Sequence, residues 1–241
     1  MTVINQPMLK FDTGAVTVEQ MAQEVLRRLK ERSNGAKPKP EPGLRPREIK
    51  VPIGVSVRHV HLCPEHVEVL FGPGHSLQVY HELYQKGYYA AREQVMVVGH
   101  KRCLEKVRVL GPPRPASQVE LAQSEAVAIG LKLPVASNGT EPQTQPVTLV
   151  GPEGIITLPG GQGGGAFLAR RHIHISDKTA AEWGVQHGHT LRLRIDGPRA
   201  VEFDDILVRV KAGWFTEVHL DTDEGNACLV QTGQLGTIIL P

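Results

Sequence analysis

The sequence predicts a mostly β protein: two small β-barrel domains with short capping helices, preceded by an N-terminal amphipathic helix on a Pro-rich linker. Composition is the first reason, because aromatic residues make up 5% of the 241 residues while Gly (25) and Pro (18) are abundant. Such a mixture favours many short strands joined by turns. The second reason is a five-residue motif that ends a predicted strand and occurs twice, which suggests two related units. The length suits one large domain or two small ones.

The first predicted element is a helix over residues 16–32. Thr17 followed by Gln20 has the pattern of a capping box, and Asn34-Gly35 would end the helix. Its apolar residues fall on one face, at Val18, Met21, Ala22, Val25, Leu26 and Leu29. Because a Pro-rich linker follows, this face must dock either on the protein's own body or on a larger assembly. The pattern alone favours the two equally.

Two zones follow the linker, and each begins with a strand that runs into a His-x-His pair. These strands cover residues 49–57 and 165–169. A helix start follows each pair, at Pro64-Glu65 and at Ser176-Asp177. Further strands are expected at 94–99, 107–110, 147–150, 155–158, 190–195, 206–210 and 217–220, with brief helices at 121–130 and 176–183.

The distribution of charge separates the N-terminal extension from the body. Residues 1–50 hold 10 Lys and Arg against 6 Asp and Glu, whereas the remaining chain holds 17 against 19. A nearly neutral body gives no reason to predict nucleic-acid binding. The three cysteines, Cys63, Cys103 and Cys228, form no Cys-x-x-Cys motif, which fits a reduced, intracellular protein. No apolar run has the length of a membrane span or the character of a signal peptide.

The repeated motif is Arg-His-aliphatic-His-aliphatic, at residues 58–62 and 171–175. Side chains at positions i and i+2 of a strand point the same way, so each pair presents two imidazoles to one point. Neutral imidazole is a good ligand for zinc and similar ions. One such pair is weak support, but two in the same frame are improbable by chance. The sequence therefore predicts that these histidines bind metal and that the metal serves catalysis.

A catalytic metal needs a third protein ligand. His219 and Glu120 lie on β-like runs and are candidates, although a surface position is the more common explanation for either alone. A third His-x-His pair, His187-Gly188-His189, falls in a Gly-containing loop, where the strand argument fails. Cys63 lies beside the first pair and could in principle act as a nucleophile. Its counterpart in the second copy is Ser176, which is predicted to be a helix cap.

Two further features bear on the substrate and on rival families. Arg114 lies between prolines, and a guanidinium held in this way suits a phosphate, although an exposed loop arginine is the alternative. The Gly-rich run 160–165 is not a P-loop, because no Lys-Ser/Thr follows it. The spacing of Gly54, His59, His61, Glu65 and Gly72 approaches the metal motif of cupins with one residue missing, so a cupin-like metal-binding module remains an alternative.

The chain resembles the phosphotransacylases of the propanediol-utilisation type, which are phosphate propanoyltransferases. The matching stretches occur in order at residues 51–62, 107–114, 118–120, 148–154, 169–174 and 219–224. The resemblance implies one barrel from residues 48–57 and 170–241 and another from residues 58–169. It also implies the reaction of a short-chain acyl-CoA, such as propionyl-CoA or acetyl-CoA, with phosphate to give acyl-phosphate and CoA. A metal-dependent hydrolase is the alternative enzyme.

The resemblance also implies a site with two divalent metal ions, usually zinc, between the barrels. His59, His61 and Glu120 would hold one ion. His172, His174 and His219 would hold the other. Arg114 would bind the phosphate and serve catalysis, and CoA would enter as substrate.

Some family members are packed inside bacterial microcompartments by an N-terminal amphipathic helix and linker. Residues 16–32, within an extension of residues 1–47, fit that pattern. The resemblance thus implies a bacterial cytoplasmic protein that contacts microcompartment shell or core enzymes, with no nucleic-acid or membrane partner. A homo-oligomer is one alternative for its assembly.

Overall fold

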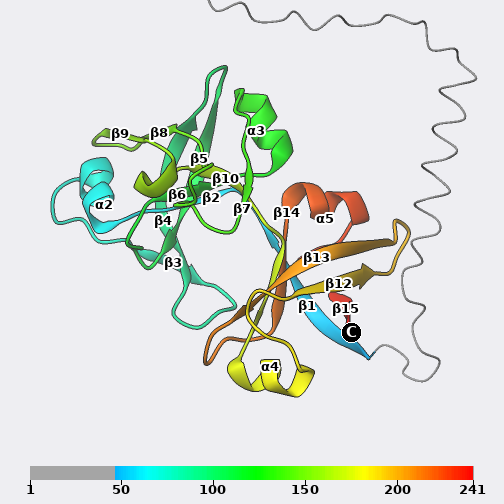
Figure 1. Ribbon diagram of the computed structural model, residues 1–241. Helices are drawn as coiled ribbons and strands as arrows, with labels where there is room; N and C mark the ends of the chain where they lie inside the picture. Colours follow the sequence, from blue (N-terminus) through cyan, green and yellow to red (C-terminus); the bar gives the residue numbers. More distant parts are fainter. Residues whose placement is uncertain (1–46, 241) are drawn as a thin grey trace, which may run out of the picture. The chain divides into compact units, whose positions relative to one another are not determined.

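The computed structural model describes residues 47–240, so the predicted helix over residues 16–32 and nearly all of the linker lie outside the described residues. The described strands form two sheets, accompanied by four short α-helices (Figure 1). The mostly β fold class predicted from the sequence is confirmed. Among the described residues, no helix has the length and apolar character needed to cross a membrane.

Six strands close into a barrel in the order β1, β14, β11, β13, β12, β15. Their bounds are β1 (Glu48–Ser56), β11 (His172–Ile175), β12 (Thr190–Ile195), β13 (Val201–Val210), β14 (Glu217–Asp221) and β15 (Leu235–Ile239). β1 reaches the barrel from the other end of the described chain, and it pairs parallel with β14 and antiparallel with β15. Because side chains alternate along a strand, Val218 and Leu220 enter the barrel core while Glu217 and His219 face outward.

The second sheet has nine strands and curls into half a barrel without closing. Eight of them follow the order β7, β10, β6, β2, β5, β4, β8, β9, and β3 pairs with β4. Their bounds are β2 (His59–His61), β3 (Val79–Glu82), β4 (Tyr89–Val98), β5 (Cys103–Gly111), β6 (Gln118–Glu120), β7 (Val135–Ala136), β8 (Val147–Val150), β9 (Ile155–Leu158) and β10 (Ala166–Ala169). Within residues 47–240 the end strands β7 and β9 do not pair with each other, so one of the two expected barrels is an open sheet.

Each His-x-His strand runs directly into a short helix, as the helix-start signals predicted. The helices are α2 (Pro64–Phe71), α3 (Gln123–Ile129), α4 (Asp177–Trp183) and α5 (Thr222–Cys228), with a 3-10 turn η1 (Gly161–Gly163). Ser176 caps α4, because its hydroxyl accepts from the Thr179 amide at 3.0 Å. Asp221 caps α5 in the same way through the Glu224 amide, at 2.8 Å. The residue before α3 is Ala122, whose side chain makes no such bond.

Each sheet encloses its own apolar core. Leu193 in β12 is fully buried inside the barrel. We expect Leu193→Ala to lower the free energy of unfolding by about 2–5 kcal/mol, because the change removes buried methyl groups and leaves a cavity. Urea denaturation would measure the loss. Val127→Ala on exposed α3 surface should stay within about 0.5 kcal/mol of the wild type. A similar small change for Leu193→Ala would contradict this description of the core.

Candidate metal centre

The first set of candidate ligands is His59, His61 and Glu120, which the structure brings together on the neighbouring strands β2 and β6. The strands run antiparallel, with His59 opposite Glu120. One potential ligand atom from each of the three residues lies within 4.8 Å of the others. His59 Nε2 is 3.5 Å from Glu120 Oε2, and His61 Nε2 is 3.9 Å from Glu120 Oε1. The three side chains therefore converge on one point.

Backbone carbonyls orient both imidazoles of the first set. His59 Nδ1 donates to the carbonyl of Val57 at 2.8 Å, and His61 Nδ1 donates to the carbonyl of Leu110 at 3.1 Å. A ring nitrogen that donates in this way leaves Nε2 with its lone pair free to act as a ligand. Both Nε2 atoms are the ones that face Glu120.

The second set is His172, His174 and His219, on the antiparallel strands β11 and β14. His172 lies opposite His219. The ring centroids are 4.8 Å apart for His172 and His174, 4.9 Å for His172 and His219, and 4.6 Å for His174 and His219. His172 Nδ1 donates to the carbonyl of Arg170 at 2.9 Å, which repeats the arrangement at His59. The two sets are thus built by the same pairing of strands.

Burial controls the charge of most of these histidines. It lowers the pKa of His61 and of His172 well below the usual range, and nearby positive charges add to the effect. The same causes lower the pKa of His174 to about 2. These imidazoles are therefore neutral near physiological pH, which is the form that binds metal ions.

The carboxylate makes the first set electrostatically different from the second. Burial acts to lower the pKa of His59, but the charge and close contact of Glu120 and the carbonyl of Val57 together outweigh burial and raise that pKa. Burial acts to raise the pKa of Glu120, but the charge of the adjacent His59, its contact with the carboxylate and the charge of Arg114 hold that pKa well below its usual range. Glu120 is thus ionised, and it favours a positive charge at the centre of the set.

The donor atoms of both sets fit a divalent metal ion. His174 Nδ1 and His219 Nε2 are buried and lack a hydrogen-bond partner within residues 47–240. Buried polar atoms without partners are unfavourable, and a bound cation would satisfy them. Three imidazoles, or two imidazoles and a carboxylate, are donor sets that suit zinc and neighbouring metals. Either set could therefore hold such an ion.

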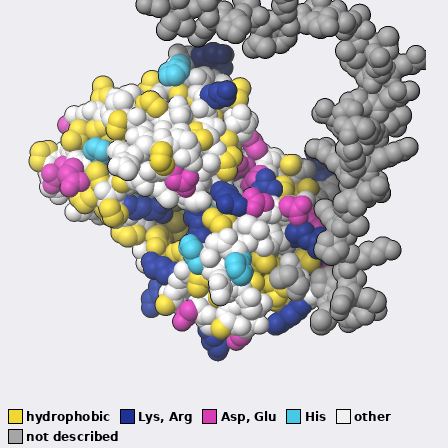
Figure 2. Space-filling model, viewed as in Figure 1, with side chains coloured by type: hydrophobic (Ala, Val, Ile, Leu, Met, Phe, Trp, Pro, Cys, Tyr) yellow, Lys and Arg dark blue, Asp and Glu magenta, His cyan; other side chains and the backbone are white. Residues whose placement is uncertain are grey.

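Two arginine side chains bring positive charge to the sets. The charge of Arg114 helps to lower the pKa of both His61 and His174, so this residue acts on both sets. Arg209 Nη1 lies 3.4 Å from His172 Nε2, and its Nη2 donates to the carbonyl of Ser137 at 2.7 Å. In Figure 2, Lys and Arg side chains gather along the band where the two sheets meet. Two guanidinium groups beside two metal-ligand sets suit a reaction that holds an anion and develops negative charge.

Arg209 could not be predicted from the sequence, because only the pairing of strands places it beside the ligands. Arg209 lies opposite His174 in the parallel pair of β11 and β13, which are far apart in the sequence. Arg209 itself belongs to a β-like run that gave no sign of which strand it would join.

Two further polar residues adjoin the third ligands, and each lies two positions before one of them. Gln118 Nε2 donates to Glu120 Oε1 at 2.8 Å and so orients the carboxylate. Glu217 is buried, and its Oε2 lies 3.0 Å from His219 Nε2 without hydrogen-bond geometry. Gly54 leaves room for it, because a Cβ there would come within 2.9 Å of Glu217 Oε1. The shared spacing of two residues was a signal available in the sequence.

The other candidates from the sequence lie outside both sets. His187 and His189 are in the loop between α4 and β12, where their Nδ1 atoms accept from the amides of Val210 and Gln186, respectively, at 3.3 Å. Cys63 is buried directly before α2, and it belongs to neither group of potential metal ligands found in residues 47–240.

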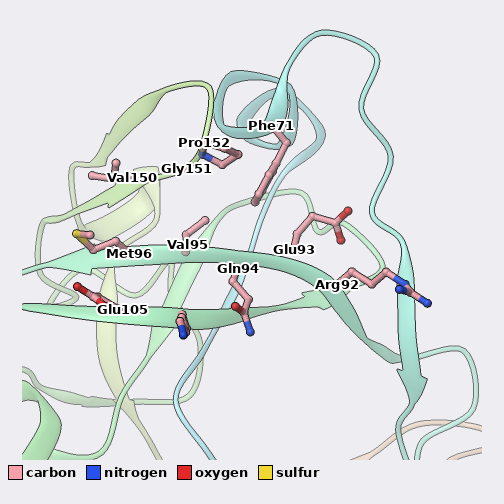
Figure 3. A pocket seen from close by; sticks show the side chains of 11 residues that line it. Phe71, Arg92, Glu93, Gln94, Val95, Met96, Glu105, Val150, Gly151 and Pro152 are labelled. Carbon is pink, nitrogen blue, oxygen red and sulfur yellow. The ribbon is translucent and has the colours of Figure 1, made fainter.

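A separate groove of about 590 Å³ lies on the second sheet (Figure 3). Its walls come from α2, β4, β5 and the turn after β8, and they include Phe71, Glu93, Met96, Glu105 and Pro152. None of the six candidate metal ligands lines it, and neither do Arg114 and Arg209. The chemistry suggested by the two sets therefore lies elsewhere on the molecule.

The chain is similar to known proteins over most of its described length. The sequence model of a family described as phosphate propanoyltransferase matches residues 52–231. Phosphate propanoyltransferases from Lachnoclostridium phytofermentans and Thermotoga maritima are each 42% identical to the chain, over 190 and 188 residues. Each alignment covers 78% of this chain, and they cover 87% and 88% of the two relatives. Another from Planctopirus limnophila is 45% identical over 177 residues, which is 73% of this chain and 71% of that relative.

Proposed function

Because the chain belongs to the phosphate propanoyltransferase family, we propose that it transfers a short acyl group between CoA and phosphate at a site with two metal ions. Acyltransfer to phosphate follows from the family. The short acyl chain, such as propionyl or acetyl, the two-metal site and the choice of zinc are our proposals. The observation that carries them is the convergence of two ligand sets, His59, His61, Glu120 and His172, His174, His219, beside Arg114.

The reaction requires a phosphate oxygen to attack the carbonyl carbon of a thioester. The new C–O bond forms as the C–S bond breaks, and the proton of HPO₄²⁻ ends on the sulfur of CoA. Arg114 would hold phosphate against the two sets, and Arg209 would offset further negative charge. Metal ions bound by the sets would polarise the thioester carbonyl and stabilise the departing thiolate. A fixed dianion beside the thioester would raise the rate by proximity and orientation.

Dependence on phosphate tests the proposed reaction. Purified protein should release free CoA from propionyl-CoA or acetyl-CoA only when phosphate is present, and acyl-phosphate should appear in equal amount. A thiol reagent would measure CoA, and hydroxylamine would trap the acyl-phosphate. Release of CoA without phosphate would favour the alternative of a metal-dependent hydrolase. A cupin-like binding module would bind one metal per chain and release no CoA.

We also propose that residues 1–47 are an encapsulation segment, with residues 16–32 as the part that contacts microcompartment shell or core enzymes. The amphipathic pattern of residues 16–32 and the Pro-rich linker support this proposal. The protein would then reside within a microcompartment of the bacterial cytoplasm. The two domains would be residues 58–169 and residues 48–57 with 170–241, a division that stays a prediction.

Deletion of residues 1–40 is expected to leave kcat and KM unchanged, because every proposed ligand lies after residue 58. The truncated protein should no longer sediment with purified microcompartments, whereas the full chain should. A truncated protein that still enters the compartments would contradict the role given to residues 16–32.

A further inference from the structure

The internal repeat includes an Arg–Glu contact next to each metal-ligand set, and the proposed reaction gives these residues no role. Arg58 directly precedes His59, and its Nη1 donates to Glu125 Oε1 at 2.8 Å. The other carboxylate oxygen of Glu125 accepts from the backbone amide of Ala122 at 2.9 Å. Ala122 lies two residues after Glu120. Glu125 therefore ties the strand of the first His-x-His pair to the turn that follows the third ligand.

The barrel repeats this arrangement at the second set. Arg171 directly precedes His172, and its Nε lies 2.7 Å from Glu224 Oε1. Glu224 Oε2 accepts from the backbone amide of Asp221 at 3.0 Å, and Asp221 lies two residues after His219. In both copies the arginine stands one residue before the His-x-His pair. In both copies the glutamate stands five residues after the third ligand. One of its carboxylate oxygens faces the arginine and the other accepts from the backbone amide.

A hydrogen-bonded contact joins the two copies of the internal repeat within the chain. Asp223 Oδ2 accepts from the amide of Ser124 at 2.7 Å, and its Oδ1 accepts from the hydroxyl of Ser124 at 2.6 Å. Each of these residues directly precedes the bridging glutamate of its own helix. Because Ala122 provides no cap for α3, the carboxylate of Asp223 supplies from the barrel the acceptor that the first turn of α3 needs. Figure 1 shows α3 and α5 next to each other where the two sheets meet.

We propose that these residues position the third ligand of each set and fix the spacing between the sets. They form one continuous group, which we name the helix-start network: Arg58, Ser124, Glu125, Arg171, Asp223 and Glu224. This inference rests on the proposed metal sites.

The short pairing of the ligand strands explains why such positioning is needed. β2 and β6 pair over three residues on each strand, and so do β11 and β14. In both copies this ladder ends at the third ligand, so the His-x-His strand does not restrain the chain that follows, whereas β10 and β1 pair with the other side of β6 and β14. The bridging carboxylates supply the missing restraint from a sheltered position, since the side chains of Glu125 and Glu224 are 13% and 16% exposed. Hydrogen bonds are stronger in such surroundings than in water.

An ordinary Arg–Glu pair in the same barrel provides the matched control. Arg192 and Glu202 are 2.8 Å apart, but their side chains are 51% and 40% exposed, and neither adjoins a ligand. Arg192→Ala therefore removes an Arg–Glu ion pair without changing any residue of the helix-start network.

Zinc retention tests the role of the two Arg–Glu pairs. Wild type, Arg58→Ala, Arg171→Ala and Arg192→Ala are loaded with Zn²⁺, dialysed against a graded chelator series, and the zinc per chain is counted. Removal of a group that orients a metal ligand weakens metal binding about 10- to 100-fold. We expect Arg58→Ala and Arg171→Ala each to release one zinc at least about tenfold more readily and to keep the other. Arg192→Ala should match the wild type.

The His172→Ala background identifies which zinc is affected, because it leaves the first set alone. In this background, Arg58→Ala should weaken binding of the remaining zinc, whereas Arg171→Ala should not. Equal weakening of both zincs, or full retention of both in each variant, would overturn the inference while leaving the proposed function intact. A wild-type chain that retains no zinc would overturn both. If circular dichroism shows an arginine variant to be unfolded, Glu125→Gln and Glu224→Gln, which keep the side-chain shape, take its place.

The contact between the copies has its own test. Asp223→Ala should keep both zincs as tightly as the wild type but lower kcat about 10- to 100-fold, because a small displacement of reacting groups has effects of that size. Asp223→Asn retains an acceptor for the Ser124 amide and should recover much of the rate. Asp204→Ala, an exposed carboxylate in β13, should change nothing. An unchanged kcat in Asp223→Ala, or loss of zinc from it, would overturn the role in spacing.

Discussion

Replacing His172 with alanine is expected to remove one of two bound metal ions and to lower kcat/KM by about three orders of magnitude. His172 belongs to the second set, and its ring lies within 4.9 Å of both other imidazoles. A metal ion that stabilises charge in the transition state contributes several kcal/mol, and each 1.36 kcal/mol corresponds to a factor of ten. Elemental analysis of purified protein would count the metal, and steady-state assays with acyl-CoA and phosphate would measure the rate.

The matched control is His187→Ala, which removes a histidine from a loop outside both sets. It should keep two metal ions and normal activity, because His187 only accepts from the amide of Val210. Two ions in His172→Ala would contradict the second set. One ion in the wild type, unaffected by His172→Ala, would favour a single-metal binding module instead.

Replacing Arg114 with alanine is expected to raise the KM for phosphate and to lower kcat/KM for phosphate by about two orders of magnitude. Its side chain is partly buried, and burial lowers its pKa, yet an arginine remains charged at physiological pH. Loss of a charge-assisted contact to a buried anion costs about 2–3 kcal/mol, which corresponds to roughly a 30- to 150-fold change. Initial rates over a series of phosphate concentrations would give the two constants.

Conservative and distant substitutions define the role of Arg114. Arg114→Lys keeps the charge without the planar fork, so it should recover part of the affinity for phosphate. Arg199→Ala removes an exposed arginine from a loop of the barrel and should leave both constants unchanged. An Arg114→Ala enzyme with a normal KM for phosphate and a raised KM for acyl-CoA would assign this residue to the other substrate.

Much of the fold class could be predicted because strand periodicity and turn residues are local signals. The helix starts after the His-x-His pairs follow from short stretches of sequence. The pairs themselves lie on separate short strands, β2 and β11, each in the other sheet from the predicted strand that precedes it, β1 or β10. The openness of the second sheet could not be predicted, because it depends on whether β7 and β9, which lie at opposite ends of the strand order, meet. Closure is a property of all the strands together.

The candidate site shows the same division between local and distant information. Spacing within a strand predicted that His59 and His61 share a face. The register of β13 against β11 was needed to find Arg209 opposite His174. Their β-like runs made Glu120 and His219 candidates for the third ligands, and the resemblance to a family then chose them over a surface position. Arg58 and Arg171 are part of the repeated motif. Their pairing with glutamates could not be predicted, because the partners lie 67 and 53 residues apart.

The place of β1 in the barrel has a consequence for synthesis on the ribosome. Ile53 pairs with Val218, so β1 leaves the ribosome long before its partner exists. At 5–20 residues per second, the interval for these 165 residues is roughly 8–33 s. During that time the residues that include His59, His61 and Glu120 have all been made, while the barrel still lacks His219 and a closed wall. The nascent chain would thus complete the first ligand set before the second.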